Sequence, residues 1–359
     1  MKNYCDNMKG ASMFSGGGIA ETYFEKAGID IVVANELIPR RGKFYQDMYP
    51  DTRMIVGDIN DNEVKKEFLD LITDDVKFLI ATPPCQGVSA LGSNKHLDQM
   101  QCDPRNYLVY NVLDVIDEKD FDFVLIENVS RFLSMVFPYK GSFYSLEDIL
   151  NDKYSEEYVI EVKDLNAKDY GVPQSRPRAI FKMYKKGKKW PWPKPQKEIT
   201  LREAIGDLPS LESGEKSSIK HHNARKHIDT HIDWMKHTPT GCSAHDNEEH
   251  YPRKKNGEKV KGFGSTYKRM RWDYPAPAVT MRSDAISSQE NVHPGRKLED
   301  GTYSDARVLT LRELFIVSSL PEEWDIPDWV TDTFMRQIIG EAIPPMFSYN
   351  IIKGIDIND

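Results

Sequence analysis

Short apolar runs alternate with helix-like segments over the first half of the chain. The apolar runs predict buried strands, and polar residues or glycines follow most of them. Between the first two runs, apolar residues recur at every third or fourth position from Ala20 to Ala27 and predict a helix that ends at Gly28. Such alternation is typical of an α/β fold with a doubly wound, mostly parallel sheet. The predicted strands are Ala11–Phe14, Ile31–Ala34, Met54–Val56, Lys77–Ala81, Phe121–Ile126, Tyr158–Val162 and Arg178–Met183.

The pattern changes after Tyr184. Residues 190–195 are rich in Pro and Trp and predict a stiff linker, and residues 196–275 are polar and poor in long apolar runs. Helical periodicity returns from Leu309, and Gly340–Pro345 predicts a strand or turn that rejoins the first domain. We therefore expect one domain from 1–187 plus 331–359, a second, smaller domain from 188–275 and a connecting region from 276–330.

Composition narrows the class of protein. No apolar run approaches the ~20 residues needed to span a bilayer, and the polar residues 1–10 do not resemble a signal peptide. The four cysteines are scattered without a CxxC pair, which argues against disulfide and zinc-thiolate frameworks and fits a reducing compartment. We expect a cytoplasmic protein with no membrane partner.

Charge is unevenly distributed. The net charge of −8 alone disfavours a nucleic-acid partner. However, Lys182–Lys194 contains no acidic residue, and Arg253–Arg271 carries eight basic residues against Glu258. Lysine runs are usually solvated surface, yet two such runs in one half of the chain indicate a side that faces phosphates.

Candidate ligand contacts follow three successive predicted strands. Gly16–Gly18 come after the first strand, Glu36 after the second and Asp58 after the third. Ligands of doubly wound sheets bind at the carboxyl ends of the strands, where an acid can accept hydrogen bonds from ribose hydroxyls or from an adenine amino group. A tight turn and ordinary surface acids would explain each feature singly. Their common position favours a nucleoside pocket.

Cys85 and Glu127 are the candidate catalytic pair. Cys85 follows Pro83 and Pro84 at the end of an apolar strand, and Glu127 ends the next predicted strand. A free cysteine is most often a small core residue, but a rigid strand-end setting suits an exposed nucleophile. A thiolate beside an acid suits attack on an electron-poor ring whose nitrogen is protonated at the same time.

Two arginines, Arg176 and Arg178, stand two positions apart near a predicted strand. On a strand they would point to the same face and could together hold a carboxylate, a phosphate or a base carbonyl. A surface ion-pair cluster is the competing interpretation.

Taken in order, these segments resemble the motifs of the DNA (cytosine-5) methyltransferase family, of the bacterial and phage type. The match following Leu165 is very close and ends in Gln174-Ser-Arg-Pro-Arg178. Ser12 stands where the family usually has Asp, and Glu341 where it usually has Asn. The other matching segments are Phe14–Gly18, Asn35–Glu36, Gly57–Ile59, Pro83–Ser89, Glu127–Val129, Arg269–Thr280 and Gly340–Pro345.

The resemblance implies a Rossmann-like methyltransferase sheet, a smaller target-recognition domain and methyl transfer from S-adenosylmethionine to carbon 5 of a flipped-out cytosine, leaving S-adenosylhomocysteine. Cys85 would attack carbon 6 while Glu127 protonates ring nitrogen 3. Arg178 would hold the base oxygen and position Glu127, Arg176 would contact a phosphate or the catalytic loop, and Gln86 would begin that loop. The implied cofactor contacts are Phe14, Ser15, Gly16, Gly18, Glu36, Leu37, Asp58, Ile59, Pro84, Leu108, Glu341 and Ala342, with Leu37 and Ile59 on either side of adenine. The expected DNA contacts are Ser89, Lys254, Lys255, Lys268, Arg269 and Arg271.

Double-stranded DNA is the expected partner of a monomeric enzyme, and a separate cognate restriction endonuclease is left open. A tRNA methyltransferase of the same fold is the main alternative, although the polar insert with its basic segments favours duplex DNA. A non-enzymatic relic would have lost Cys85 or Glu127, and both are present. Seven of the nine histidines lie between His221 and His250. A zinc site there, with His227 and His231 at helical spacing, is a further alternative, but no metal is expected.

Overall fold

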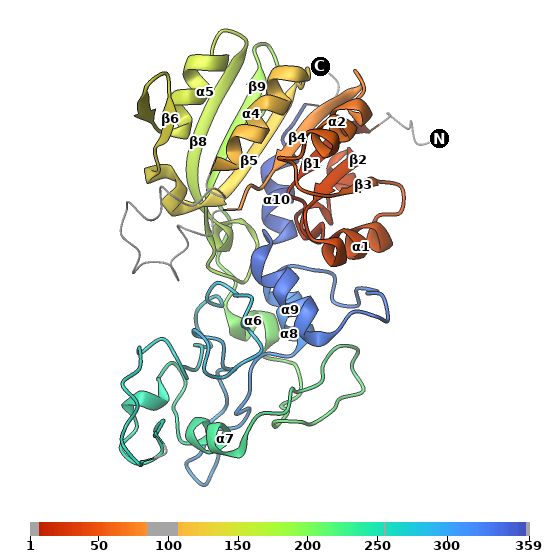
Figure 1. Cartoon of the computed structure of the whole chain (residues 1–359). Coiled ribbons are helices and arrows are strands. Elements are labelled where there is room, and N and C mark those ends of the chain that lie inside the picture. The colour runs from red at the N-terminus through yellow and green to blue at the C-terminus, as the bar shows by residue number, and fades with distance from the viewer. Residues whose placement is uncertain (1–6, 85–106, 255, 357–359) are drawn as a thin grey trace. The chain divides into compact units, whose positions relative to one another are not determined.

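Two compact units make up the computed structural model, which describes residues 7–84, 107–254 and 256–356 (Figure 1). Unit 1 comprises Met1–Asn166, Pro177–Lys194 and Ser348–Asp359, and unit 2 comprises Ala167–Arg176 and Pro195–Phe347. These bounds differ from the expected ones. Residues 167–176 and 331–347 belong to unit 2, residues 188–194 belong to unit 1, and the expected connecting region at 276–330 is part of unit 2. The assignment of catalysis and target recognition to separate domains remains a prediction.

Unit 1 is built on a seven-stranded sheet with the order β3-β2-β1-β4-β5-β9-β8. Strands β1 to β5 run parallel, whereas β9 is antiparallel to both β5 and β8. The expected doubly wound, mostly parallel sheet is therefore confirmed. The strands are β1 (Met8–Met13), β2 (Ile29–Glu36), β3 (Arg53–Val56), β4 (Val76–Ala81), β5 (Phe123–Val129), β8 (Tyr158–Asn166) and β9 (Pro177–Lys185), with a separate hairpin of β6 (Phe137–Tyr139) and β7 (Ser142–Tyr144).

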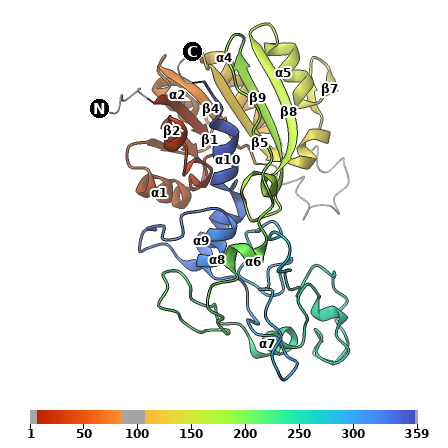
Figure 2. The same cartoon turned by 180° about the vertical axis from the view of Figure 1, so that it is seen from behind.

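Helices cover both faces of this sheet. Buried residues of α2, α4 and α5 form one core cluster with alternate residues of the strands, such as Val124 and Ile126 of β5. Figures 1 and 2 show α4 and α5 on one face of the sheet and α10 on the other. The helices with residues in unit 1 are α1 (Pro39–Met48), α2 (Asn62–Leu71), α4 (Val109–Glu118), α5 (Leu146–Tyr154) and α10 (Pro345–Ile352), with the short 3₁₀ helices η1 (Ile19–Glu21), η2 (Glu25–Ala27) and η5 (Ser130–Ser134).

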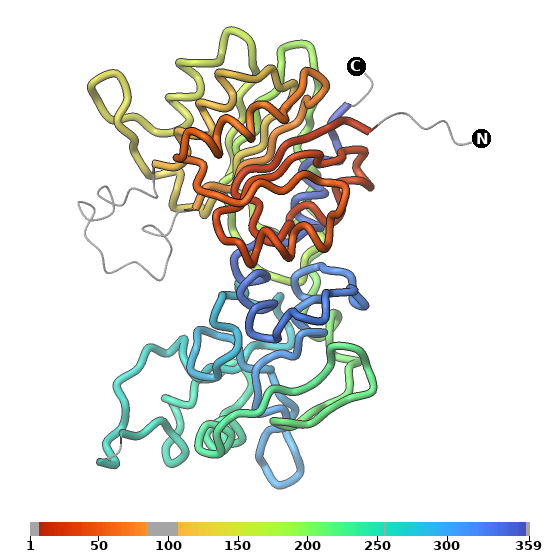
Figure 3. Tube along the Cα trace, turned by 45° about the vertical axis from the view of Figure 1, so that its right-hand side comes forward, coloured from red at the N-terminus to blue at the C-terminus, as the bar shows by residue number. Residues whose placement is uncertain are grey.

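Trp190 begins the predicted linker at 190–195, but its side chain is buried against the other face of the sheet. Its ring lies edge-on to Phe78 and Phe123, and only 1% of its surface is exposed. Its indole Nε1 donates to the carbonyl of Ile351 at 2.8 Å. Figure 3 shows the carboxyl-terminal helix, in blue, beside the red and orange amino-terminal strands. The sheet is thus covered by a segment from the far end of the chain.

The predicted helix over residues 20–27 is replaced by η1 and η2. Gly18 precedes η1 in the left-handed conformation, and the turn at Thr22, Tyr23 and Phe24 separates the two short helices. Gly28, with φ 79°, ends η2 in the left-handed conformation expected of a helix C-cap. The apolar spacing was correct, but the tight turns that bring this segment against the sheet break the α-helix.

Unit 2 contains few regular elements. A buried ionic network replaces part of its core: the guanidinium of Arg307 contacts Asp305 at 2.8 Å and Glu313 at 2.7 Å. The predicted strand or turn at Gly340–Pro345 is the end of α9, a turn and the first residue of α10. The elements of unit 2 are η6 (Ala167–Tyr170), α6 (Leu201–Ile205), α7 (Asp229–Lys236), η7 (Ala244–Asp246), α8 (Leu311–Val317) and α9 (Asp332–Glu341).

No helix among the described residues combines the length and apolarity that a bilayer crossing requires.

Candidate active site

The loop after β1 bends sharply towards the end of β2. Phe14, Gly16 and Gly18 have φ of 59°, 57° and 70°, and the amide of Gly16 donates to Glu36 Oε2 at 2.9 Å. A Cβ at Gly18 would lie 2.5 Å from the Tyr49 ring, so this position requires glycine. The amide of Ser15 donates to the carbonyl of Asn35 at 3.0 Å. The structure therefore brings together the two strand ends at which the sequence placed cofactor contacts.

Glu36 is buried, with 5% of its surface exposed. Besides the Gly16 amide, its carboxylate accepts a hydrogen bond from the amide of Ile38 at 2.8 Å. A carboxylate has about four acceptor sites, so these two amides leave capacity for hydroxyl donors. Two backbone donors thus fix the orientation of an acid that can still accept from a ribose.

The expected adenine contacts are not equivalent. Leu37 is 58% exposed, whereas Ile59 is 2% exposed and packs in the main core. Asp58 is exposed, and its Oδ1 accepts from the Asn60 amide at 2.9 Å. Leu37 and Asp58 are therefore accessible to a ligand in this structure, and Ile59 is not.

Two further expected cofactor contacts in unit 1 lie at the ends of elements. Pro84 is half-buried and follows β4. Leu108 is the N-cap residue of α4 and packs partly buried against the core. Glu341 and Ala342 belong to unit 2, where Glu341 ends α9 and Ala342 is its C-cap residue.

Glu21 is a buried acid that the sequence analysis did not single out. Its carboxylate accepts from Ser12 Oγ at 2.5 Å and from the Tyr45 hydroxyl, and Ser15 Oγ donates to Ser12 Oγ at 2.9 Å. Burial raises the pKa of Glu21 from 4.5 to about 7, against the lowering effect of the Ser12 and Tyr45 hydrogen bonds. Two features of the sequence could have indicated this buried acid. Glu21 lies within a segment of apolar helical periodicity, and its partner Ser12 stands where the family usually has Asp.

Glu127 and Arg178 form an ion pair at the ends of two adjacent strands. Arg178 Nε lies 2.8 Å from Glu127 Oε1, with side-chain exposures of 12% and 9%. Arg178 of β9 is opposite Val129 of β5, which places it diagonally from Glu127 on the same face of the sheet. A partly desolvated guanidinium therefore holds this carboxylate in one orientation.

Cys85, Gln86 and Ser89 lie outside the described residues. The chain leading to Cys85 is nevertheless fixed, because Asn128 Nδ2 donates to the Pro83 carbonyl at 3.0 Å. β4 and β5 are paired in parallel up to Ala81 and Ile126. The end of β4, from which Cys85 follows, is therefore tied to the residue next to Glu127. The expected convergence of Cys85 and Glu127 remains a prediction.

Arg176 does not lie on the strand that carries Arg178, contrary to the same-strand prediction. Arg176 precedes β9 and belongs to unit 2, where its guanidinium donates to the carbonyls of Val279 and Gly340 at 2.8 Å each. It is 3% exposed. The expected contact with a phosphate or the catalytic loop is replaced by a structural role, because the guanidinium donates to backbone carbonyls inside unit 2.

The basic residues expected to contact DNA have different environments. Lys254 and Arg271 are exposed, and Lys268 is paired with Glu290. Arg269 is 1% exposed and donates to the carbonyls of Met235 and His293 at 2.9 and 2.8 Å. A buried guanidinium held by backbone carbonyls is not available to a base edge, so the prediction for Arg269 is wrong. Lys255 lies outside the described residues.

The histidines suggested for zinc are used in other ways. His227 precedes α7, and its Nε2 accepts from the Val308 amide at 3.3 Å, while burial lowers its pKa to about 4. His231 contacts the Tyr267 hydroxyl at 3.4 Å. Ile228, expected on the buried face of this helix, is 59% exposed. The helical spacing of His227 and His231 therefore does not produce a pair of ligands.

Comparisons with known proteins match almost the whole chain. The model of the family described as C-5 cytosine-specific DNA methylase matches residues 8–356. Type II methyltransferase M1.HgaI of Avibacterium volantium is 49% identical over 350 residues, which cover 97% of this chain and 98% of that protein. Type II methyltransferase M1.HphI of Haemophilus parahaemolyticus is 27% identical, with coverages of 98% and 87%.

Solved structures show the same fold. A DNA modification methyltransferase encoded within an E. coli prophage matches with a TM-score of 0.69 at 19% identity, covering 97% of this chain and 98% of that one. The comparisons confirm the expected enzyme class and favour the DNA interpretation over the tRNA alternative. The chain belongs to the C-5 cytosine-specific DNA methylase family.

Proposed function

We propose that this enzyme transfers a methyl group from S-adenosylmethionine to carbon 5 of a flipped-out cytosine in a short, specific sequence of duplex DNA. Cys85 forms a covalent bond to carbon 6 of the base, Glu127 donates a proton to ring nitrogen 3, and Arg178 contacts the base oxygen. Carbon 5 then takes the methyl group, which leaves S-adenosylhomocysteine. A base removes the proton from carbon 5, Cys85 leaves as the thiolate, and the proton on ring nitrogen 3 returns to Glu127, which restores the aromatic ring.

The Glu127–Arg178 pair is the observation that carries this proposal. A carboxyl group must donate a proton to ring nitrogen 3 as the thiolate adds, so that negative charge does not build up on the ring. The Arg178 guanidinium orients that carboxyl group from 2.8 Å. The Asn128–Pro83 hydrogen bond holds the start of the Cys85 loop beside it. An acid, a cation and a strand end that precedes a cysteine are the groups this reaction needs.

The loop after β1 fits the cofactor. Gly16 has open space at its Cβ position and a positive φ, and Glu36 can accept ribose hydroxyls while it holds the Gly16 amide. Asp58 is exposed for the adenine amino group, and Leu37 for contact with the ring. When bound, S-adenosylmethionine supplies the electrophilic methyl group.

Target recognition was expected at 188–275, and we assign it to the part of this segment that belongs to unit 2, residues 195–275. Lys254, Lys268 and Arg271 are the described candidates for DNA contact. The enzyme acts as a cytoplasmic monomer and modifies DNA independently of any companion endonuclease. Relatives named Type II methyltransferases support a restriction-modification setting. A segment of this size presents few base-contacting side chains, so a target of about four to six base pairs is expected.

Two cysteine variants test the chemistry. Cys85→Ala should abolish methyl transfer and leave DNA binding intact, whereas Cys242→Ala, a half-exposed free cysteine of unit 2, should retain activity. Glu127→Gln should lower the rate by about 10²–10⁴-fold, the usual contribution of a general acid. Wild-type enzyme should remain covalently attached to DNA whose target cytosine carries fluorine at carbon 5, because no proton can leave from that position. Activity retained in Cys85→Ala would refute the assignment.

Bisulfite sequencing of DNA from a methylation-free host that expresses the enzyme tests the substrate. Every methylated cytosine should share one short motif. Methylation confined to RNA would support the tRNA alternative, and methylation scattered over all cytosines would contradict sequence-specific recognition.

A further inference from the structure

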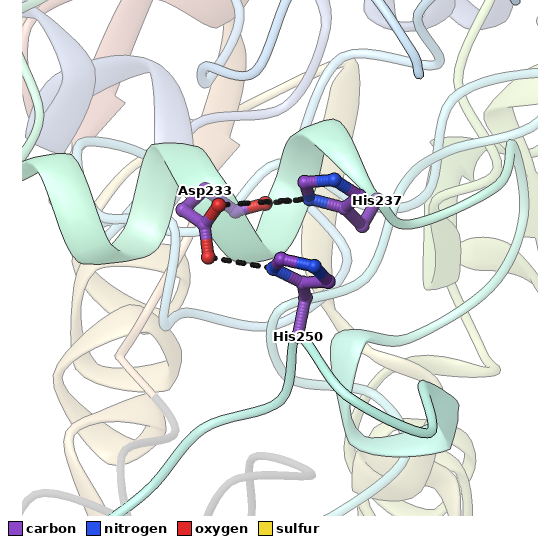
Figure 4. A group of neighbouring side chains, drawn as sticks. All are labelled: Asp233, His237 and His250. Atoms are coloured by element: carbon purple, nitrogen blue, oxygen red, sulfur yellow. Dashed lines mark hydrogen bonds and ion pairs between the residues drawn. The ribbon is translucent and has the colours of Figure 1, made fainter. Parts of the chain in front are cut away.

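Three side chains of unit 2 converge at a place that the proposed methyl transfer does not use (Figure 4). Asp233 lies on α7, His237 is the C-cap residue of that helix, and His250 comes from the segment after η7. One ligand atom from each lies within 4.8 Å of the other two. We propose that Asp233, His237 and His250 form a binding site for a divalent transition-metal ion and that zinc is the ion it suits best.

The two histidine rings direct the same atom towards the carboxylate. His250 Nδ1 lies 2.8 Å from Asp233 Oδ2, and His237 Nδ1 lies 3.6 Å from Asp233 Oδ1. The rings stack with centroids 3.4 Å apart and planes 8° from parallel. The lone pair of an imidazole nitrogen lies in the ring plane, so two stacked, parallel rings do not yet aim at one point. Rotation of one ring about its side-chain bonds would direct both Nδ1 atoms, which already face Asp233, to a common position. Figure 4 shows the stacked arrangement.

The donor set selects the class of metal. Two imidazole nitrogens and one carboxylate oxygen suit zinc and neighbouring transition metals, whereas magnesium and calcium prefer oxygen ligands alone. Zinc binds such atoms at about 2.0–2.2 Å, which places tetrahedral ligands roughly 3.4 Å from one another. The present separations need only side-chain adjustment to reach that value. Water completes the coordination sphere.

The backbone around the site is held in place without a metal. The Asn247 side-chain amide lies 2.9 Å from Thr238 Oγ1 and 2.8 Å from the His250 carbonyl. Thr238 and Met235 are fully buried and fix the end of α7. Metal binding must replace the hydrogen bond between His237 Nδ1 and the Asp233 carbonyl, which is 2.9 Å long. The metal would therefore join two segments that are already adjacent.

Titration of untagged, chelator-treated, full-length protein with zinc chloride tests the site. Calorimetry should give one zinc ion per chain, and zinc should raise the thermal unfolding temperature. His237→Ala and His250→Ala should each weaken zinc binding at least about tenfold, since loss of outer partners alone has that effect. His231→Ala is the matched control, because His231 lies on the same helix but contacts Tyr267, and it should bind zinc as the wild type does.

Three outcomes of the zinc titrations would overturn the proposal. They are the absence of zinc binding by wild-type protein, binding unchanged in both His237→Ala and His250→Ala, and equal loss of binding in His231→Ala. The second would assign the zinc to other groups, such as the cysteines. Far-UV circular dichroism of each variant without metal checks folding, and His250→Gln replaces any variant that does not fold. Magnesium chloride should produce no saturable heat, and equal binding of magnesium would also exclude the site.

Discussion

Replacing Glu21 by Gln should remove a loss of stability that the wild-type enzyme suffers as the pH rises from about 4.5 to about 7. Glu21 is 6% exposed, and burial raises its pKa from 4.5 to about 7. A carboxyl group with a raised pKa stays protonated to a higher pH in the folded state than in the unfolded state. Its ionisation therefore opposes folding: the penalty is absent below about pH 4.5, grows as the pH rises and is complete above about pH 7.

The magnitude follows from that pKa. A rise from 4.5 to about 7 corresponds to about 3 kcal/mol of stability lost when Glu21 ionises. Gln has a similar shape and cannot ionise. Glu21→Gln therefore removes the loss of stability that accompanies ionisation of this side chain. Loss of one hydrogen bond from Ser12 or Tyr45 adds a constant offset of about 1 kcal/mol against the variant.

Urea unfolding of both proteins between about pH 5 and pH 8.5 measures the difference by linear extrapolation. The free energy of unfolding of the variant, relative to that of the wild type, should increase by about 2–3 kcal/mol between the lower and the upper pH. Glu25→Gln is the control, because Glu25 is exposed on the neighbouring short helix and water solvates it in both states. A difference between Glu21→Gln and wild type that stays constant with pH would refute the reasoning.

Three other substitutions and one control test the packing within each unit by the same unfolding assay. Gly340→Ala should lose about 1–3 kcal/mol, because its Cβ would lie 2.3 Å from backbone atoms of Thr280 and Met281. Gly264→Ala, with open space at its Cβ position, should change stability by less than about 0.5 kcal/mol, and an equal loss in both would contradict the steric argument. Arg269→Met should lose about 3 kcal/mol or more by leaving buried carbonyls without a donor; if the residue instead contacted DNA, stability would be unchanged and DNA affinity would fall. Trp190→Ala should lose about 3–5 kcal/mol, whereas a Trp190 in a solvent-exposed linker would tolerate the change.

The sequence predicted the central strands of the sheet well because they are buried on both faces. Such strands appear as continuous apolar runs, as at Val76–Ala81. The contact between Gly16 and Glu36 also followed, since both stand at the ends of neighbouring parallel strands. The local sequence pattern is therefore enough to predict a contact when both residues directly follow neighbouring parallel strands.

Predictions failed where burial depends on distant segments. Arg269 and Arg176 have the sequence context of surface basic residues, yet carbonyls far along the chain surround both guanidiniums. Trp190 lies between prolines and charged residues, and its burial depends on Phe78, Phe123 and Ile351. No local periodicity carries that information, because these contacts form only when the tertiary structure does.

The position of α10 has a consequence for how this protein is made. The Ser348 hydroxyl donates to the carbonyl of Ala20, 328 positions earlier, and Trp190 is covered by Ile351. On the ribosome, the sheet of unit 1 is translated before the segment from Ser348 onward that seals it. The nascent chain therefore carries an open apolar face throughout synthesis of unit 2, and contacts of such high sequence separation fold slowly. A translation stop before Ser348 would release a protein in which the apolar face around Trp190 stays exposed to water. We therefore expect complete folding of unit 1 to require the segment from Ser348 onward.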